Sequence, residues 1–450
     1  MTNLVIIGGS DAGISASLRA KEIDPEIDVT VVVADCFPNY SICGLPFYLS
    51  GEVKEWNTLA HRSIDEIEKQ GVRLLLDHKA ASIDKNNKTV TVINRKERKT
   101  ILEYDRLIIA TGAVSARPAL TGFALPGVFT LRWMDDGLAI KQYMDTHKPS
   151  SVVILGTGYI GMEMADALTR KGLSVSVIAR SGRILKTVDP DIGEIIRKEL
   201  SDNDVQLYDG INVRGIVNQN DRLSIINDEG LLIEGDMVLL ATGARPESTL
   251  AAECGIETGI KGAIRVNNAM ETSVRDIYAA GDCVETWHRV LKKYTYIPLG
   301  TTSHKQGMVA GENAAGGKTV FPGSSGTQVV KIFDLVAART GLNEGEAEEA
   351  GFCPVTCDLE ATDHKAYYPN STPVLIRITG DLKTHRLLGA QILGHYGAEI
   401  SKRIDIFATA LFNEMTVESL NHVDLSYTPP LSSPWDPVQM AAQAWVKKAV

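Results

Sequence analysis

The sequence predicts an α/β protein built around two parallel sheets. Short apolar strands at 4–7 and 152–155 each run into a glycine-rich turn and then into a helical stretch. A further apolar strand follows each unit at βαβ spacing, at 29–33 and 174–178. Later strands end twice in the same tripeptide, Ala-Thr-Gly. Strands that alternate with helices are typical of parallel sheets, so the pattern predicts two segments of related construction.

The bulk composition limits the class of protein. A length of 450 residues is too great for one hydrophobic core and predicts about two to four domains. The formal net charge of −10 argues against nucleic acid or an anionic membrane as a partner. No apolar run approaches the ~18 residues of a membrane span, and the first residues lack the basic region of a signal peptide. Six cysteines are too few for a disulfide framework, so we expect reduced thiols and a cytoplasmic protein.

The first glycine turn contains Gly8 and Gly13, separated by small residues and followed by a helix expected over about 14–21. The N-terminus of such a helix favours a pyrophosphate, because its N–H groups are unpaired and its dipole is positive there. An acidic residue at the end of the next strand is expected to bind a ribose hydroxyl. Asp35 is the candidate, although it comes about two residues later than the pattern requires.

The second turn is a full Gly-x-Gly-x-x-Gly between a strand and a helix. Gly156 makes the tight turn, Gly158 admits the pyrophosphate, and Gly161 lets helix and strand pack closely. The next strand ends in a segment with Arg180 and Arg183 and without a carboxylate. Guanidinium groups suit a 2′-phosphate, so we predict NADPH as the second cofactor, with NADH as the alternative. In the other interpretation, these arginines are only the solvated side chains of a turn.

Two further segments complete the nucleotide sites. Ala110, Thr111 and Gly112 end one strand, and the same tripeptide recurs at 241–243. This echo is expected if both nucleotide-binding segments have related construction. A later strand ends in Gly-Asp, which puts the carboxylate of Asp282 at a helix start, where it can hold a ribityl chain.

Cys43 is the candidate nucleophile. It lies in the stretch 41–48, and Gly44 and Pro46 follow it. Proline is tolerated in the first turn of a helix, so the pattern puts Cys43 at or just before a helix N-terminus. That position favours a thiolate of low pKa. A buried, inert cysteine is the alternative.

In their order along the chain, these motifs resemble those of the pyridine nucleotide–disulfide oxidoreductases. The resemblance covers essentially the whole chain. It implies a glutathione-reductase-like fold, in which the first and third segments bind FAD and the middle segment binds the nicotinamide cofactor. It also implies a C-terminal α+β domain that makes a homodimer. The boundaries we expect are 1–112 with 245–320 for the FAD domain, 113–244 for the NAD(P)H domain and 326–450 for the dimerisation domain.

The number of active-site cysteines sorts the members of this family. Glutathione-reductase-like enzymes carry two cysteines in one helix, whereas this chain has only Cys43 there. Cys36 is in the wrong position, and we interpret it as structural. Cys353 and Cys357 lack a second pair for a metal site and receive the same interpretation. The sequence therefore resembles the single-cysteine branch of coenzyme A-disulfide reductases, coenzyme A persulfide reductases, and NADH oxidases and peroxidases.

Two features bear on the choice within that branch. The peroxidase and oxidase members carry a histidine in the first glycine turn, where this chain has Ser10 and Asp11. In coenzyme A-disulfide reductases, a tyrosine from each of two C-terminal regions reaches across the dimer to the substrate sulfur. Those regions resemble 364–369 and 425–430 here, which implies that role for Tyr367, or its neighbour in the sequence, and for Tyr427. The alternative is that both tyrosines only pack in the dimer interface.

Several positions depart from the coenzyme A pattern. The residue before the cysteine is often Asn and is here Ile42, and a basic residue of the first helix is here Glu22. The remaining candidate partners for substrate phosphates are Arg19, Lys21 and Arg62. The family pattern also puts Pro298 and Lys305 near the flavin.

We therefore predict an FAD-dependent, NAD(P)H-linked reductase of a coenzyme A disulfide, a persulfide or a similar small thiol-derived acceptor, with no metal. NADPH passes hydride to FAD, reduced FAD regenerates Cys43, the Cys43 thiolate attacks the acceptor sulfur, and a tyrosine protonates the departing thiol. Two alternatives stay open: an NAD(P)H oxidase or peroxidase, and a redox-sensing flavoprotein that acts by binding a partner.

Overall fold

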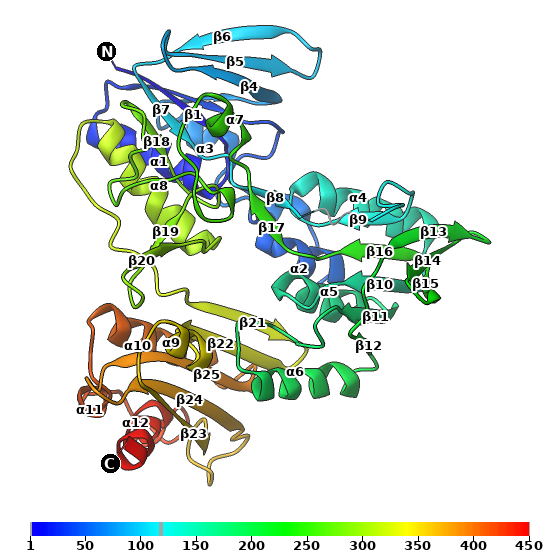
Figure 1. The fold of residues 1–450 in the computed structure, drawn as a ribbon, viewed down its shortest axis with the longest axis vertical. Helices are drawn as coiled ribbons and strands as arrows, with labels where there is room; N and C mark the ends of the chain where they lie inside the picture. Colours follow the sequence, from blue (N-terminus) through cyan, green and yellow to red (C-terminus); the bar gives the residue numbers. More distant parts are fainter. Residues whose placement is uncertain (1, 117–119, 450) are drawn as a thin grey trace.

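The computed structural model describes residues 2–116 and 120–449. Figure 1 shows three bodies: a sheet with its helices at the amino-terminal end, a second sheet beside it, and a C-terminal layer below both. Within the described ranges, no helix is both long and apolar enough to cross a bilayer.

The first sheet is parallel and has the strand order β18-β7-β1-β2-β3. Its strands are β1 (Asn3–Ile7), β2 (Asp28–Val32), β3 (Val72–Leu75), β7 (Arg106–Ile109) and β18 (Ile277–Ala279). Because β18 comes from a segment far along the chain, the sheet is discontinuous in sequence, as expected. Helices α1 (Asp11–Ile23) and α8 (Gly300–Ala314) pack closely together beside it.

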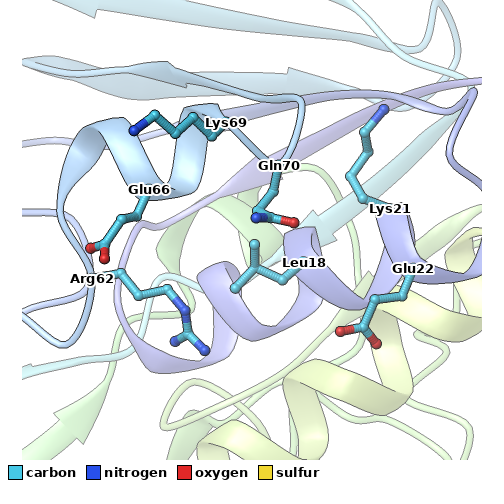
Figure 2. Close-up of a pocket in the computed structure, with 7 residues that line it drawn as sticks. All are labelled: Leu18, Lys21, Glu22, Arg62, Glu66, Lys69 and Gln70. Atoms are coloured by element: carbon cyan, nitrogen blue, oxygen red, sulfur yellow. The ribbon is translucent and has the colours of Figure 1, made fainter.

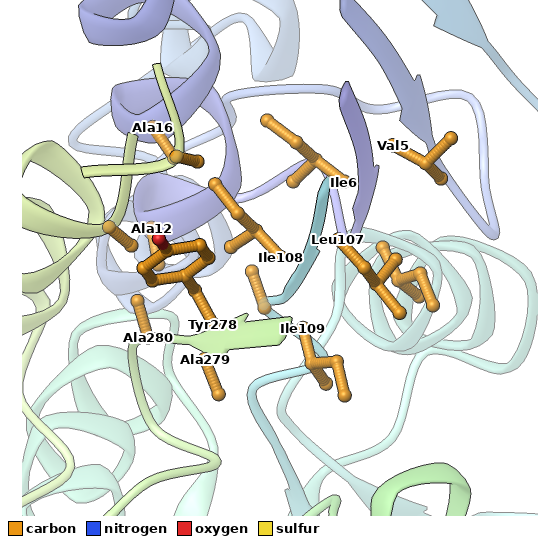
Figure 3. Close-up of a cluster of buried hydrophobic side chains, with 14 of the residues drawn as sticks. Val5, Ile6, Ala12, Ala16, Leu107, Ile108, Ile109, Tyr278, Ala279 and Ala280 are labelled. Atoms are coloured by element: carbon orange, nitrogen blue, oxygen red, sulfur yellow. The ribbon is translucent and has the colours of Figure 1, made fainter. Parts of the chain in front are cut away.

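Small residues make the close packing of α1 and α8 feasible. A Cβ at Gly307 would lie 2.2 Å from the carbonyl oxygen of Ala12, and one at Gly311 would lie 2.1 Å from that of Ala16. Ala12 and Ala16 are buried together with Ile108, and Figure 3 shows these side chains between α1, β7 and β18. This packing brings the first glycine turn beside the start of α8, which is far from it in sequence.

The second sheet is also parallel, with the order β12-β11-β10-β16-β9. Its strands and helices are β9 (Val128–Thr130), α4 (Met134–His147), β10 (Ser151–Leu155), α5 (Tyr159–Arg170), β11 (Ser174–Ala179), α6 (Pro190–Asp202), β12 (Gln206–Asp209) and β16 (Met237–Leu240). The two parallel bodies are joined by an antiparallel pair, β8 (Ala113–Ser115) with β17 (Ala244–Pro246).

The C-terminal part contains one antiparallel sheet with the order β21-β22-β25-β24-β23. Its elements are β21 (Gln328–Ile332), β22 (Leu335–Gly341), α9 (Glu344–Glu349), β23 (Pro354–Thr362), β24 (Pro373–Asp381), β25 (Leu387–His395), α10 (Ile400–Phe412), α11 (Val417–Leu420) and α12 (Pro437–Ala449). The observed architecture confirms the predicted fold class, two parallel sheets followed by an α+β domain. The exact domain boundaries stay predictions.

The remaining elements are short and lie at the edges of these bodies. The 3-10 turns are η1 (Ile42–Gly44), η2 (Trp56–Leu59) and η3 (Ile260–Gly262), and the short helices are α2 (Leu45–Ser50), α3 (Ile64–Glu68) and α7 (Thr249–Glu253). One three-stranded sheet contains β4 (His78–Asp84), β5 (Thr89–Asn94) and β6 (Lys99–Glu103), and another contains β13 (Gly215–Gln219), β14 (Arg222–Asn227) and β15 (Gly230–Gly235). Strands β19 (Thr286–His288) and β20 (Lys293–Thr295) form a pair.

Candidate active site

The two glycine turns have the same local geometry. Gly8 has φ +118°, and a Cβ there would lie 2.1 Å from the carbonyl oxygen of Ala110. Gly156 has φ +119°, and a Cβ would lie 2.3 Å from that of Ala241. Both positions require glycine because of the backbone angle and the close approach. Each Ala-Thr-Gly segment thus lies against the first glycine of its own turn, which explains why the tripeptide recurs.

Both turns end in helix N-termini that suit a pyrophosphate. The N-cap residues of α1 and α5, Ser10 and Gly158, make no side-chain capping bond, so N–H groups of the first turn remain available. A Cβ at Gly158 would have no neighbour within 4 Å, which leaves space for a ligand. Gly13 and Gly161 close the turns, since a Cβ at either would lie about 2 Å from a carbonyl oxygen of the same turn. These residues fit FAD at the first turn and a nicotinamide dinucleotide at the second.

Asp282 lies in a charged cluster between the two parallel bodies. Its carboxylate is 2.5 Å from Arg132 Nη2 and accepts a hydrogen bond of 2.9 Å from Ser303 Oγ. Sequence reasoning missed Arg132, which precedes α4 and carries no motif.

Lys305, the predicted cation near the flavin, is exposed on α8, and Pro298 is half-buried two residues before that helix. Their contact with a flavin stays a prediction.

Asp35 is half-buried after β2. One of its carboxylate oxygens accepts a hydrogen bond of 2.9 Å from the backbone N–H of Phe37. Burial raises its pKa above the ordinary value. Its role toward a ribose hydroxyl stays a prediction.

Thr111 Oγ1 donates to the Glu247 carbonyl at 2.5 Å, so this side chain ties its strand end to the segment that follows β17. Gly112 has φ +70°.

Cys43 lies in η1, immediately before α2, as the sequence predicted. The residue is exposed, whereas Leu45 of α2 is buried in a cluster that includes Met162 of α5 and Phe333 beyond β21. This cluster fixes the start of α2 between all three bodies. The thiol is consequently presented at the place where they meet.

The expectation of a low thiol pKa is wrong for this chain. Desolvation of the sulfur by the protein atoms around it, and then the carboxylates of Glu163, Asp11 and Asp282, raise the pKa of Cys43, although one side of the residue stays exposed. Arg132 acts in the opposite direction. The six-residue helix α2 contributes little dipole, and desolvation of the sulfur together with the negative charges around it outweighs that dipole. These charges also locate the thiol, because they come from the first turn, the end of β18 and the helix of the second turn.

Glu163, on the helix that follows the second turn, is the charged group that raises the pKa of the Cys43 thiol most. Desolvation, followed by the charge of Asp166, raises its pKa to about 7, and Lys331 partly offsets this shift. The carboxyl group therefore changes charge near neutral pH.

The other five cysteines are free, and none of their thiols is among the groups that shift the pKa of Cys43. Cys353 precedes β23 and Cys357 lies within it, four residues apart in extended chain. That spacing corresponds to about 13 Å, too far for a disulfide. Within the described residues, no group of three or more His, Cys, Asp or Glu side chains could hold a metal ion.

The two predicted tyrosines lie side by side in the C-terminal domain. Loss of solvent around its hydroxyl, and then the neighbouring phenol of Tyr427, raise the pKa of Tyr367. Both residues are exposed, with 73% of Tyr367 and 45% of Tyr427 accessible. An exposed tyrosine pair of this size is suited to contact another molecule.

Arg403 of α10 holds the two tyrosine loops together. Its buried guanidinium donates to the carbonyl of Asp363 at 2.6 Å and to that of Leu431 at 3.5 Å, and it lies 3.6 Å from the Asp436 carboxylate. A direct backbone bond of 3.3 Å joins Lys365 to Pro429. No motif marks Arg403, because the loops that it joins are distant in the sequence.

A cavity of about 460 Å³ lies beside the carboxyl end of α1. Arg62 and Lys69 border it on one side and Lys21 and Glu22 on the other, as Figure 2 shows. The ammonium of Lys21 donates to two backbone carbonyls, whereas Arg62 is exposed. The structure thus brings two of the three predicted phosphate partners together.

The third predicted phosphate partner, Arg19, is engaged in ion pairs. Its guanidinium pairs with Glu312 at 2.6 Å and with Glu22 at 2.9 Å. Sequence reasoning missed Lys69 at the cavity.

The loop after β11 presents exposed cations. Arg180 and Arg183 are both exposed, and Arg183 donates to the Val188 carbonyl at 3.1 Å. Arg197 of α6 supports the loop by donating to the Gly182 carbonyl at 2.6 Å.

Comparisons with known proteins decide the family. The model of the pyridine nucleotide-disulphide oxidoreductases matches residues 2–307, and the model of their dimerisation domain matches residues 327–437. The chain belongs to the pyridine nucleotide-disulphide oxidoreductases. It is therefore an enzyme of this family, for which FAD and NAD(P)H are typical cofactors, as the sequence predicted.

Several relatives in this oxidoreductase family match over their whole length. A CoA-dependent NAD(P)H sulfur oxidoreductase of Pyrococcus furiosus is 37% identical over 443 residues, which cover 98% of both chains. A coenzyme A disulfide reductase of Staphylococcus haemolyticus is 30% identical, again with 98% of both chains covered. Among solved structures, an engineered water-forming NADPH oxidase bound to NADPH has a TM-score of 0.94 and 27% identity over 99% of both chains.

Proposed function

We propose that this oxidoreductase uses NADPH and FAD to reduce a coenzyme A disulfide, a persulfide or a similar small acceptor through Cys43. One observation carries the proposal. A single exposed thiol lies among charges from both nucleotide turns, Glu163 after the second and Asp11 in the first. The other cysteines do not share the site, so Cys43 is expected to form a mixed disulfide with a small thiol.

Two of the charged residues that act on this thiol, Asp282 and Arg132, are among or beside those assigned to FAD. Gly8 and Gly13 form the turn that would receive the pyrophosphate, and Asp282 with Arg132 offers polar partners to the ribityl chain and flavin. Bound FAD supplies the hydride and electron-pair chemistry that the side chains lack. The chain contributes the orientation of the nucleotides and the nucleophile.

The preference for NADPH is supported by a sequence comparison. The engineered oxidase bound to NADPH carries consecutive replacements of aspartate by alanine, alanine by arginine and methionine by serine, and a proline is replaced by arginine five positions later. This chain has Ala179, Arg180 and Ser181 at the end of β11, and Lys186 five positions later. Cations without a neighbouring free carboxylate favour a 2′-phosphate.

The cavity beside α1 supports a long acceptor with a charged tail. Asp11, near the thiol, and Glu22, at the cavity, lie eleven residues apart on α1, which corresponds to ~16 Å along the helix. Ser15 and Leu18 lie between them on the same face. A thiol carried on an arm of this length, with phosphates beside Arg62 and Lys69, fits the arrangement and agrees with the coenzyme A named for the two relatives.

The side chains divide the remaining chemistry. The Cys43 thiolate attacks an acceptor sulfur, and a partner subunit's tyrosine pair at the position of Tyr367 and Tyr427 donates a hydrogen bond and a proton to a departing thiolate. A homodimer is expected, since the dimerisation model matches 327–437. We expect the enzyme in the cytoplasm, where its six cysteines stay reduced.

The test compares wild type with Cys43→Ser. The variant should retain FAD but lose NADPH-dependent reduction of coenzyme A disulfide, and mass spectrometry of the wild type should find a coenzyme A adduct on Cys43. Full turnover by the variant would disprove the mechanism. Oxygen consumption by the wild type without any disulfide would favour the oxidase alternative, and negligible turnover with every thiol acceptor would favour the redox sensor.

The nucleotide preference has its own test. Arg180→Ala should raise the KM for NADPH and leave that for NADH nearly unchanged. Arg214→Ala is the matched control, since this arginine of the same domain is exposed and pairs with Asp228. Equal KM values for both nucleotides in the wild type would refute the preference.

A further inference from the structure

His304 of α8 is a titratable group at the active site that no sequence motif marks. Its Nε2 lies 3.2 Å from Asp11 Oδ1, and its Nδ1 lies 2.8 Å from Ser15 Oγ. Asp11 Oδ1 is buried, and among the described residues no hydrogen-bond donor other than this imidazole lies close to it. The close packing of α1 on α8 therefore holds the ring against the face of α1 that runs from the thiol to the cavity.

This position lies between the nucleophile and the acceptor tail. Asp11 is near enough to Cys43 for its charge to raise the thiol's pKa. On its other side, the ring of His304 is 6.3 Å from that of His61, and Arg62, the next residue, borders the cavity. An acceptor whose tail lies in the cavity and whose sulfur reaches Cys43 must pass the imidazole, which is 40% exposed.

The reaction gains from such a group. Reduction of a disulfide releases two thiolates, and an alkyl thiolate, whose conjugate acid has a pKa of about 8.5, leaves more slowly than a less basic thiolate, so an acid that protonates it speeds its departure. The tyrosine pair proposed above can protonate one of these two thiolates, but phenols are weak acids at neutral pH. An imidazolium is a better donor under these conditions, because its pKa lies near the working pH.

Resting on the proposed function, we propose that His304, paired with Asp11, donates the proton to the thiolate released when Cys43 opens the acceptor disulfide. The Cys43 thiolate forms a bond to one acceptor sulfur, the sulfur–sulfur bond breaks, and its electron pair goes to the departing sulfur. That sulfur takes the proton from His304, and the neutral imidazole regains a proton from solvent. The step is a thiol–disulfide exchange without net oxidation.

Charged groups on both sides of the ring determine its protonation. The hydrogen bond and charge of Asp11 raise the pKa of His304, and desolvation and then the charge of Arg62 partly oppose them. His61 faces the ring edge from the segment after η2 and Ser15 faces it from α1. A donor must be protonated, so the rate of the acceptor step should fall as pH rises through the pKa of His304.

The test varies the leaving group. Holoenzyme carrying His304→Gln is assayed with coenzyme A disulfide, which releases an alkyl thiolate, and with 5,5′-dithiobis(2-nitrobenzoate), whose aromatic thiolate needs no proton. We expect kcat/KM to fall about 10²-fold or more with the first and less than about threefold with the second. His147→Gln, an exposed histidine at the end of α4, is the matched control and should match wild type with both.

A second variant tests the electrostatic partner. Asp11→Asn should move the high-pH decline in kcat/KM for coenzyme A disulfide to lower pH, since the neutral amide no longer stabilises the imidazolium. An equal loss of rate with both disulfides in His304→Gln, or an unshifted pH profile in Asp11→Asn, would overturn the role of His304. Failure of the wild type to reduce either disulfide would instead refute the proposed function.

Discussion

Arg377 provides the sharpest test of how the C-terminal domain supports the nucleotide-binding domain. This buried β24 residue lies 3.0 Å from Asp189, 2.5 Å from Asp191 and 2.6 Å from Asp358. Asp189 is the N-cap residue of α6, and Gln391 also donates to it at 2.7 Å. The cluster therefore anchors the beginning of α6 and the loop that carries Arg180.

The cost of Arg377→Met follows from the burial of its partners. The Asp189 side chain is only 11% exposed, and leaving such a charge without its partner costs about 3–5 kcal/mol. Asp191 and Asp358 are 66% and 45% exposed, so each loses at most about 1 kcal/mol. At roughly 2–4 °C per kcal/mol, we expect the first thermal transition to fall by about 6 °C or more.

Calorimetry on the holoenzyme checks this value, with Arg214→Met as the control, because the ion pair of that arginine with Asp228 is exposed. The double variant Arg377→Met, Asp189→Asn should recover part of the loss, since it removes the unpaired buried charge. The KM for NADPH should rise in the single variant. A transition lowered by less than about 2 °C, without recovery in the double variant, would refute the reasoning.

The pH dependence has a definite sign. The hydrogen bond from Arg377 lowers the pKa of Asp191 below its ordinary value of 3.8. A carboxyl group with a lowered pKa stabilises the folded protein above its unfolded value, and this contribution is lost as pH falls through the folded pKa. The difference in stability between wild type and Arg377→Met should therefore shrink in acid.

Three further predictions concern the thiol, the tyrosines and the C-terminal core. Glu163→Gln should speed the alkylation of Cys43 by iodoacetamide above about pH 7, where the wild-type carboxylate is charged and raises the thiol's pKa, and unchanged rates would contradict this electrostatic coupling. Arg403→Lys should lower kcat for disulfide reduction while NADPH-dependent dye reduction continues, because only the loops of the tyrosine pair lose support; parallel losses would contradict it. Trp445→Ala removes a fully buried ring whose Nε1 donates to the Val355 carbonyl at 2.7 Å, and should cost about 3–5 kcal/mol in a denaturant titration; a loss below 1 kcal/mol would contradict that packing.

The sequence predicted the elements whose causes are local. Gly8 and Gly156 indicate their turns in the sequence, because no other residue accepts both the positive φ and the close carbonyl oxygen. The strands that lead into the turns were predicted to within a residue at either end. The first helix was predicted to begin near 14 and begins at Asp11, since Ser10 is already its extended N-cap residue.

The position of Cys43 before a helix was also correct, because Gly44 and Pro46 fix it locally. The predicted low pKa of its thiol was wrong. It depends on carboxylates that three distant segments bring to the thiol, and on the packing that removes water from it. Motif reasoning counted the dipole of a helix and had no access to these charges.

The sequence by itself therefore determined the family and the two glycine turns, and it predicted Cys43 as the nucleophile, since each of these depends on a few adjacent residues. Only the tertiary structure paired Arg132 with Asp282 across 150 residues and brought His304 to Ser15 across 289. Such pairs carry no periodicity or motif, because they arise where separate elements pack. The charges that govern proton transfer and thiol reactivity are set there, as electrostatic interactions depend on distance in space and on the exclusion of water.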